Sequence, residues 1–194
     1  MPRLETPRLV LRPPEYSDVP AIANFLSDYD VAKNLANVPH PFGVSDARAY
    51  VTRAHERRAL GEGFCFAILD AESEWFLGCC RLSLTGGRYT ISYWLGKGYW
   101  NRGYMSEAAK RLLGFAFRDL KADQVWASWL ADNPASGRVL EKLGFRPVET
   151  YMREILARRD AAVPCNRMTL TRAEFGRKRP RLDKPACEAE LLSA

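Results

Sequence analysis

The residues best suited to chemistry lie in a glycine-rich turn, Gly96-Lys-Gly-Tyr-Trp-Asn-Arg-Gly-Tyr-Met-Ser106. It follows an apolar, strand-like run and leads into a segment with helical spacing of apolar residues. The first amides of a helix have no partner within the helix, and the helix dipole favours an anion there. Gly103 lets the backbone aim several N–H groups at one point, and Arg102 adds positive charge. The turn therefore suits a pyrophosphate, with a purely structural turn as the alternative.

Thiol and metal chemistry is poorly supported by the sequence. Five cysteines occur without any C-x-x-C pair: Cys65, Cys79, Cys80, Cys165 and Cys187. With only two histidines, a zinc site lacks ligands, so we expect no metal. Neighbouring Cys79 and Cys80 are predicted to point to opposite faces of a strand. The odd number of cysteines and the lack of an export signal indicate reduced thiols in the cytoplasm.

The elements that must position the turn alternate between strand and helix patterns. Strands are predicted near residues 9–12, 64–69, 75–84, 89–95, 124–130, 153–156 and 166–171. Helices are predicted near residues 18–27, 46–60 and 106–120, and a short one follows Asn133, a good N-cap residue. The order β-α-α-β-β-β-α-β-α-β-β predicts an α/β protein with a mixed sheet and helices on both faces.

The length and charge of the chain limit how many domains it can form and which partners it can have. The 194 residues are 47% hydrophobic and 27% charged, as in a globular protein. We expect one domain over residues 1–175, and no membrane partner because no apolar run approaches about 18 residues. Residues 176–185 carry +4 of the net charge of +6, and we expect residues 176–194 to be a basic tail. The tail suits either a solvated role or contact with nucleic acid.

Three blocks of sequence resemble the GNAT N-acetyltransferase superfamily, and more narrowly its RimJ/RimL-type branch. The first runs from Tyr93 to Ala108 and is similar to the coenzyme-A-binding motif. The second joins Asn133-Pro-Ala-Ser136 to Val139-Leu-Glu-Lys-Leu-Gly-Phe145, and the third is Leu4-Glu-Thr-Pro-Arg-Leu-Val-Leu-Arg12. The resemblance covers about residues 3–172, and it implies the GNAT fold with splayed central strands.

The resemblance implies transfer of an acetyl group from acetyl-CoA to a primary amine by direct attack in a ternary complex. It implies that Tyr93, Trp94 and Leu95 pair with the pantetheine arm, and that Asn133 and Ser136 also contact the coenzyme. It further implies that the pyrophosphate is held at six consecutive residues: Asn101, Arg102, Gly103, Tyr104, Met105 and Ser106. Asn101 stands where the branch commonly has glycine, and Met105 where it has a small residue.

Three residues are candidates for the catalytic chemistry. The resemblance places Ser136 near the coenzyme sulfur, where its hydroxyl could protonate the leaving thiolate; otherwise it only begins a helix. Glu154 lies near the position of a catalytic glutamate in RimL-like proteins, and the alternative is a surface carboxylate paired with Arg153 or Arg158. Tyr93 is a further candidate acid, or a packing residue.

The sequence leaves the acceptor open between a protein N-terminus and a small amine. A different class of function, a non-catalytic module that binds acyl-CoA or nucleic acid through the basic tail, is supported by the tail alone. We therefore prefer the two enzymatic interpretations. A homodimer is left open.

Overall fold

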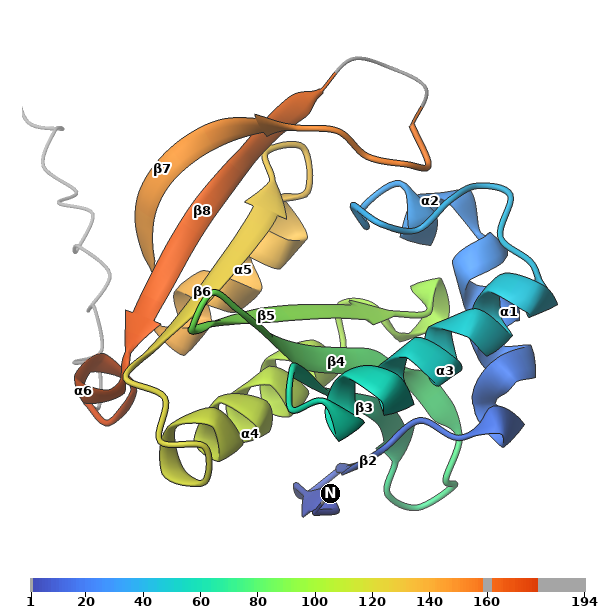
Figure 1. Cartoon of the computed structure of the whole chain (residues 1–194), viewed down its shortest axis with the longest axis horizontal. Helices are drawn as coiled ribbons and strands as arrows, with labels where there is room; N and C mark the ends of the chain where they lie inside the picture. Colours follow the sequence, from blue (N-terminus) through green and yellow to red (C-terminus); the bar gives the residue numbers. More distant parts are fainter. Residues whose placement is uncertain (1, 159–161, 178–194) are drawn as a thin grey trace, which may run out of the picture.

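Eight strands form one mixed sheet in the computed structural model, which describes residues 2–158 and 162–177 (Figure 1). In chain order the strands are β1 (Leu4–Glu5), β2 (Leu9–Arg12), β3 (Gly63–Asp70), β4 (Phe76–Thr85), β5 (Arg88–Leu95), β6 (Gln124–Leu130), β7 (Arg146–Arg153) and β8 (Val163–Thr171). Across the sheet they follow the order β1-β2-β3-β4-β5-β6-β8-β7. Only the pairing of β5 with β6 is parallel among these strands.

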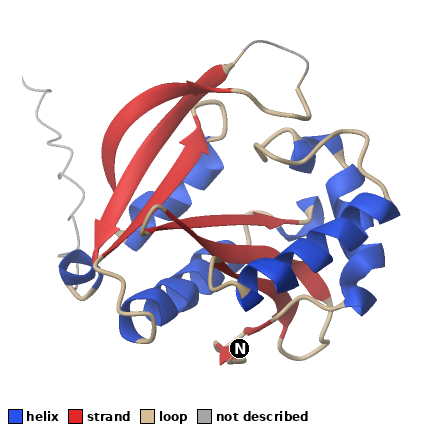
Figure 2. Ribbon diagram, in the orientation of Figure 1, coloured by secondary structure: helices blue, strands red, loops and turns tan. Residues whose placement is uncertain are grey.

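Helices cover both faces of this sheet, as Figure 2 shows. The apolar residues of two helices pack on one face: α1 (Val19–Ser27) and α3 (Val44–Ala59). The other face is covered by α4 (Tyr104–Arg118) and α5 (Pro134–Leu143). Two short helices, α2 (Tyr29–Ala32) and α6 (Arg172–Phe175), and two 3-10 turns at Tyr16–Asp18 and Lys97–Tyr99 complete the described elements. The predicted α/β class and element order are confirmed.

The alternation of side chains along β4 separates the two cores. Cys79 is buried with residues of α1 and α3, whereas Cys80 is buried with residues of α4. Successive residues of a strand point to opposite faces, so the predicted division of this pair is confirmed. Arg81 therefore lies on the same face of the sheet as Cys79 and α3.

The central strands separate soon after they meet. Parallel pairing of β5 with β6 is limited to Tyr89 with Val125 and Thr90 with Trp126. Beyond this point the two strands diverge (Figure 1), while β5 stays paired with β4 as far as Leu95. Among the described residues, the edge of β5 that faces β6 therefore has no strand partner from Ile91 onward. The predicted splay of the central strands is confirmed.

One predicted strand is misplaced. We expected a strand near residues 153–156, but β7 occupies Arg146–Arg153. It lies at the edge of the sheet, most of its residues are exposed, and Pro147 adjoins a register shift against β8. An edge strand with both faces in water has no alternation of apolar residues, which explains the error. Of the predicted tail, residues 178–194 lie outside the described part of the chain.

Candidate active site

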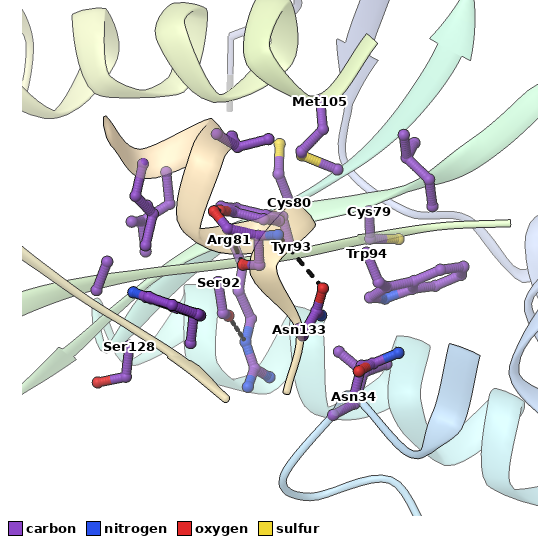
Figure 3. Close-up of a pocket in the computed structure, with 18 of the residues that line it drawn as sticks. Asn34, Cys79, Cys80, Arg81, Ser92, Tyr93, Trp94, Met105, Ser128 and Asn133 are labelled. Atoms are coloured by element: carbon purple, nitrogen blue, oxygen red, sulfur yellow. Dashed lines mark hydrogen bonds between the residues drawn. The ribbon is translucent and has the colours of Figure 1, made fainter. Parts of the chain in front are cut away.

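A cavity of about 820 Å³ lies where β5 and β6 separate. Its wall is formed by the ends of both strands, parts of β3 and β4, the start of α4, one side of α5 and the segments around α2 and α3. Residues from both faces of the sheet therefore meet in one space, as Figure 3 shows for ten labelled side chains. A cavity that passes through a sheet in this way suits an elongated ligand.

The glycine-rich turn forms one end of the cavity. Gly103 and Asn101 both adopt left-handed backbone conformations, with φ of +80° and +60°. Asparagine tolerates this conformation better than most residues, which explains why it can stand where glycine is usual. The first backbone hydrogen bond of α4 runs from the amide of Glu107 to the carbonyl of Gly103. The preceding amides, from Asn101 to Ser106, donate to no carbonyl or side chain of the described residues.

An ion pair from the start of the chain braces this turn. The Arg8 guanidinium contacts Glu107 at 2.7 Å and donates to the carbonyl of Arg102 at 3.1 Å. The Thr6 hydroxyl donates to the same carboxylate at 2.7 Å, and Arg8 also lies over the Tyr104 ring. Thr6 and Arg8 belong to the block Leu4–Arg12, and the sequence did not predict that this block positions the turn. The brace fixes the start of α4 relative to β2.

The side chains of the turn divide between cavity, core and solvent. Asn101, Gly103, Tyr104, Met105 and Ser106 line the cavity. The Met105 side chain is buried with the core under α4, so it leaves the adjacent amides uncovered. Arg102 is exposed and is not part of the cavity wall, so its predicted phosphate contact stays a prediction.

Tyr93 and Ser136 contact each other in the cavity wall. The Tyr93 hydroxyl lies 3.2 Å from both the carbonyl oxygen and the Oγ of Ser136. Asn133 caps α5 and accepts a hydrogen bond from the Ser136 amide at 3.3 Å, which fixes the start of that helix. The capping role predicted for Asn133 is confirmed. The fold thus brings together the hydroxyl groups of two residues that are 43 positions apart in the sequence.

Burial determines the protonation of this pair. Desolvation raises the pKa of Tyr93 from its ordinary value of 10.0 to about 12, and the hydrogen bond to Ser136 lowers it in part. Tyr93 is therefore protonated at neutral pH and is suited to donate a proton rather than to accept one. The Ser136 hydroxyl lies within hydrogen-bond distance of this phenol, at 3.2 Å.

Glu154 does not lie in the cavity wall. It is exposed and follows the last residue of β7, so the strand that was expected to point it into a cleft ends before it. Arg158, one of its predicted partners, pairs instead with Asp132 at 2.6 Å. Among the described residues, no Asp, Glu or His lines the cavity. The role of Glu154 as base stays a prediction.

The opposite end of the cavity contains polar residues that sequence reasoning missed. Arg81 donates through Nε to the Ser92 hydroxyl at 2.8 Å, and Figure 3 shows its side chain directed away from Met105. The Trp94 indole N–H donates to the Tyr50 hydroxyl at 3.4 Å. These side chains belong to α3, β4 and β5, so the register of the two strands and the packing of α3 on the sheet bring them together.

Comparison with known proteins decides the family. A family model described as an acetyltransferase (GNAT) domain matches residues 8–146. The chain belongs to the GNAT acetyltransferase family. It is also 30% identical over 149 residues to the uncharacterized N-acetyltransferase p20 of Bacillus licheniformis, a match that spans 75% of this chain and 83% of that protein. The predicted family and enzyme class, an N-acetyltransferase, are confirmed.

Solved structures agree with the RimJ/RimL resemblance. RimJ from Mycobacterium smegmatis, in complex with a CoA disulfide, superposes with a TM-score of 0.77 at 17% identity, covering 87% of this chain and 84% of that one. RimL, a ribosomal L7/L12 alpha-N-protein acetyltransferase in complex with coenzyme A, superposes with a TM-score of 0.76 at 17% identity, covering 86% and 95%. These likenesses establish the shared GNAT fold.

The described residues contain neither a cluster of metal ligands nor a helix that could span a membrane. Within residues 2–158 and 162–177, no three His, Cys, Asp or Glu side chains are grouped to hold a metal ion. No helix in the described part of the chain is long and apolar enough to cross a membrane.

The raised pKa of Tyr93 predicts a loss of stability at alkaline pH. Above pH 10 the unfolded chain releases this proton while the folded protein keeps it, so the free energy of unfolding falls as pH rises toward 12. Between about pH 9 and 10.5, Tyr93→Phe should lose about 1 kcal/mol less stability than the wild type in urea denaturation. The exposed Tyr29 gives the control Tyr29→Phe. Equal losses in all three proteins would contradict the assignment.

Proposed function

We propose that the chain transfers the acetyl group of acetyl-CoA to a primary amine by direct attack in the cavity between β5 and β6. The observation that carries the proposal is the combination of unpartnered amides before Glu107 with the Tyr93–Ser136 hydroxyl pair in one cavity. We assign this activity to a domain spanning residues 1–175. The four described cysteines are buried and free, which supports the expected reducing, cytoplasmic setting.

Successive stretches of the cavity wall suit successive parts of acetyl-CoA. The amides of Asn101–Ser106 suit the pyrophosphate, because they have no acceptor among the described residues and five of these six residues line the cavity. The free edge of β5 over Tyr93–Leu95 suits the amides of the pantetheine arm, which can pair with it as a strand would. The indole N–H of Trp129 is also buried in this cavity wall without an acceptor among the described residues. The fit therefore rests on backbone donors more than on charge.

The hydroxyl pair supplies a proton to the leaving sulfur. The amine nitrogen forms a bond to the thioester carbon, the carbon–sulfur bond breaks, and the sulfur takes the proton of Ser136. Tyr93 is protonated and lies 3.2 Å from Ser136 Oγ, so it can replace that proton. In this proposal Tyr93 and Ser136 act as a unit, with Asn133 holding the helix that carries Ser136.

The amine proton leaves by another route. No Asp, Glu or His of the described residues lines the cavity, so the proposal gives this proton to water. The positive charge of Arg81 lowers the pKa of an amine nearby and favours the neutral form that attacks. The acceptor is either a protein N-terminus or a small amine. Support for the first comes from the likeness to RimL, which is named for a protein acceptor.

Release of free thiol from acetyl-CoA tests the activity. We expect release with at least one amine in a panel of peptides and small amines, and Ser136→Ala should lower kcat about tenfold or more. Its affinity for acetyl-CoA should stay within about twofold, because the backbone donors are unchanged. Ser27→Ala, on the exposed end of α1, is the matched control. Tight acetyl-CoA binding with no thiol release from any amine would refute the enzymatic proposal.

The pyrophosphate cradle is tested by two glycines of similar backbone conformation. Gly103 has φ of +80°, and Gly86, in the turn between β4 and β5, has φ of +55°. Replacement by alanine strains both backbones by about 1 kcal/mol. Gly103→Ala should weaken acetyl-CoA binding about tenfold in calorimetry, whereas Gly86→Ala should leave the affinity unchanged. Equal affinities of the two variants would remove the cradle from the proposal.

A further inference from the structure

The charged side chains of the cavity are all of one sign. Its wall contains six basic residues and no acidic residue among those described: Arg53, Arg57, Arg81, Arg138, Lys142 and Arg153. Of the six, Arg57 alone pairs with a carboxylate of the described residues, Glu62, at the long distance of 4.0 Å. Arg57, Arg81 and Arg153 are partly buried, so their charges are screened less than those of the exposed Arg53, Arg138 and Lys142, and the field in the cavity is positive.

Position in the fold separates five of these charges into two groups, and the sixth, Arg153, ends the edge strand β7 and belongs to neither. Arg138 and Lys142 lie one turn apart on α5, the helix that carries Ser136 and packs with α4. They therefore belong with the coenzyme end. Arg81 lies on the other face of the sheet, together with Arg53 and Arg57 of α3. This second group is on the side left for the acceptor.

Arg81 is held in place for bidentate binding. Its Nε donates to the Ser92 hydroxyl at 2.8 Å, and no described residue accepts a hydrogen bond from its two terminal nitrogens. A guanidinium fixed at Nε presents its terminal N–H groups in a planar fork, the geometry that matches a carboxylate or a phosphate. The Nε of Arg57 is likewise buried without a hydrogen-bond acceptor among the described residues.

From this arrangement we infer that the acceptor amine carries an oxyanion, a carboxylate or a phosphate group, which Arg81 binds together with Arg53 and Arg57. This inference rests on the proposed function, since it names the class of amine that the same cavity takes. A polyamine or another purely cationic acceptor is repelled by the same charges. A neutral amine that lacks the oxyanion leaves the guanidinium of Arg81 without a partner.

Pairs of acceptors that differ only in the oxyanion test the inference on the full-length protein. We would compare kcat/KM by thiol release for 4-aminobutyrate with 4-aminobutanamide and for phosphoethanolamine with ethanolamine. A third pair consists of peptides with acidic or amidated second and third side chains. A charge-assisted hydrogen bond predicts that the charged member of at least one pair is preferred by about tenfold or more. The pair that shows the preference distinguishes carboxylate from phosphate.

Three variants locate the preference. Arg81→Gln and Arg53→Gln should each reduce the ratio of kcat/KM values within the preferred pair by about fivefold or more. Arg53 is exposed, so its variant stays informative if Arg81→Gln fails to fold. Arg48→Gln, an arginine of the same helix outside the cavity wall, should leave the ratio unchanged.

The outcomes separate this inference from the proposed function. Thiol release at equal rates for charged and neutral members, or a preference for cationic amines, overturns the inference and leaves the acetyltransferase proposal intact. A preference that survives both Arg81→Gln and Arg53→Gln also overturns it. No release with any acceptor, despite acetyl-CoA binding, overturns both.

Discussion

The separation of β5 from β6 is the constraint on which the site depends. Paired strands satisfy one another's backbone groups, and buried groups that lose this pairing cost free energy unless something replaces it. After two paired residues on each strand, β5 continues with one free edge into a cavity of about 820 Å³. An extended ligand rich in amides can pair with that edge as an added strand. The same separation lets Tyr93 reach Ser136 of α5 and exposes the amides before Glu107 to the same space.

The distribution of charge divides this space into two ends with different tasks. At the α4 end, binding is assigned to backbone amides that a helix start leaves free, and these need no side-chain charge. At the α3 end, arginines without acidic neighbours in the wall create a positive field. Such a field favours a neutral amine with an anionic group beside it. It therefore keeps the amine ready to attack although no described residue of the wall offers a carboxylate or an imidazole as base. Tyr93, kept protonated by burial, fits the role of acid between the two ends.

Features that depend on local residue preferences could be predicted from the sequence. Features that depend on contacts between distant segments could not. The turn at Gly103 and the cap at Asn133 follow from residue types whose backbone preferences are local. The misplaced strand had no such signal, because β7 is an exposed edge with no apolar alternation. The pairing of Arg81 with Ser92 depends on strand register, and the approach of Tyr50 to Trp94 depends on helix packing. The spacing of these residues along the chain predicts neither contact.

Amide hydrogen exchange with and without acetyl-CoA tests the central claim most directly, because that claim concerns backbone groups. If the coenzyme pairs with the free edge of β5 and the start of α4, exchange should slow about tenfold or more over residues 92–95 and 101–106. Amides of β1, β2 and β3 should change much less. Saturating acetyl-CoA that leaves residues 101–106 unprotected, or that slows exchange equally along the whole chain, would contradict the assignment of the cavity as the coenzyme site.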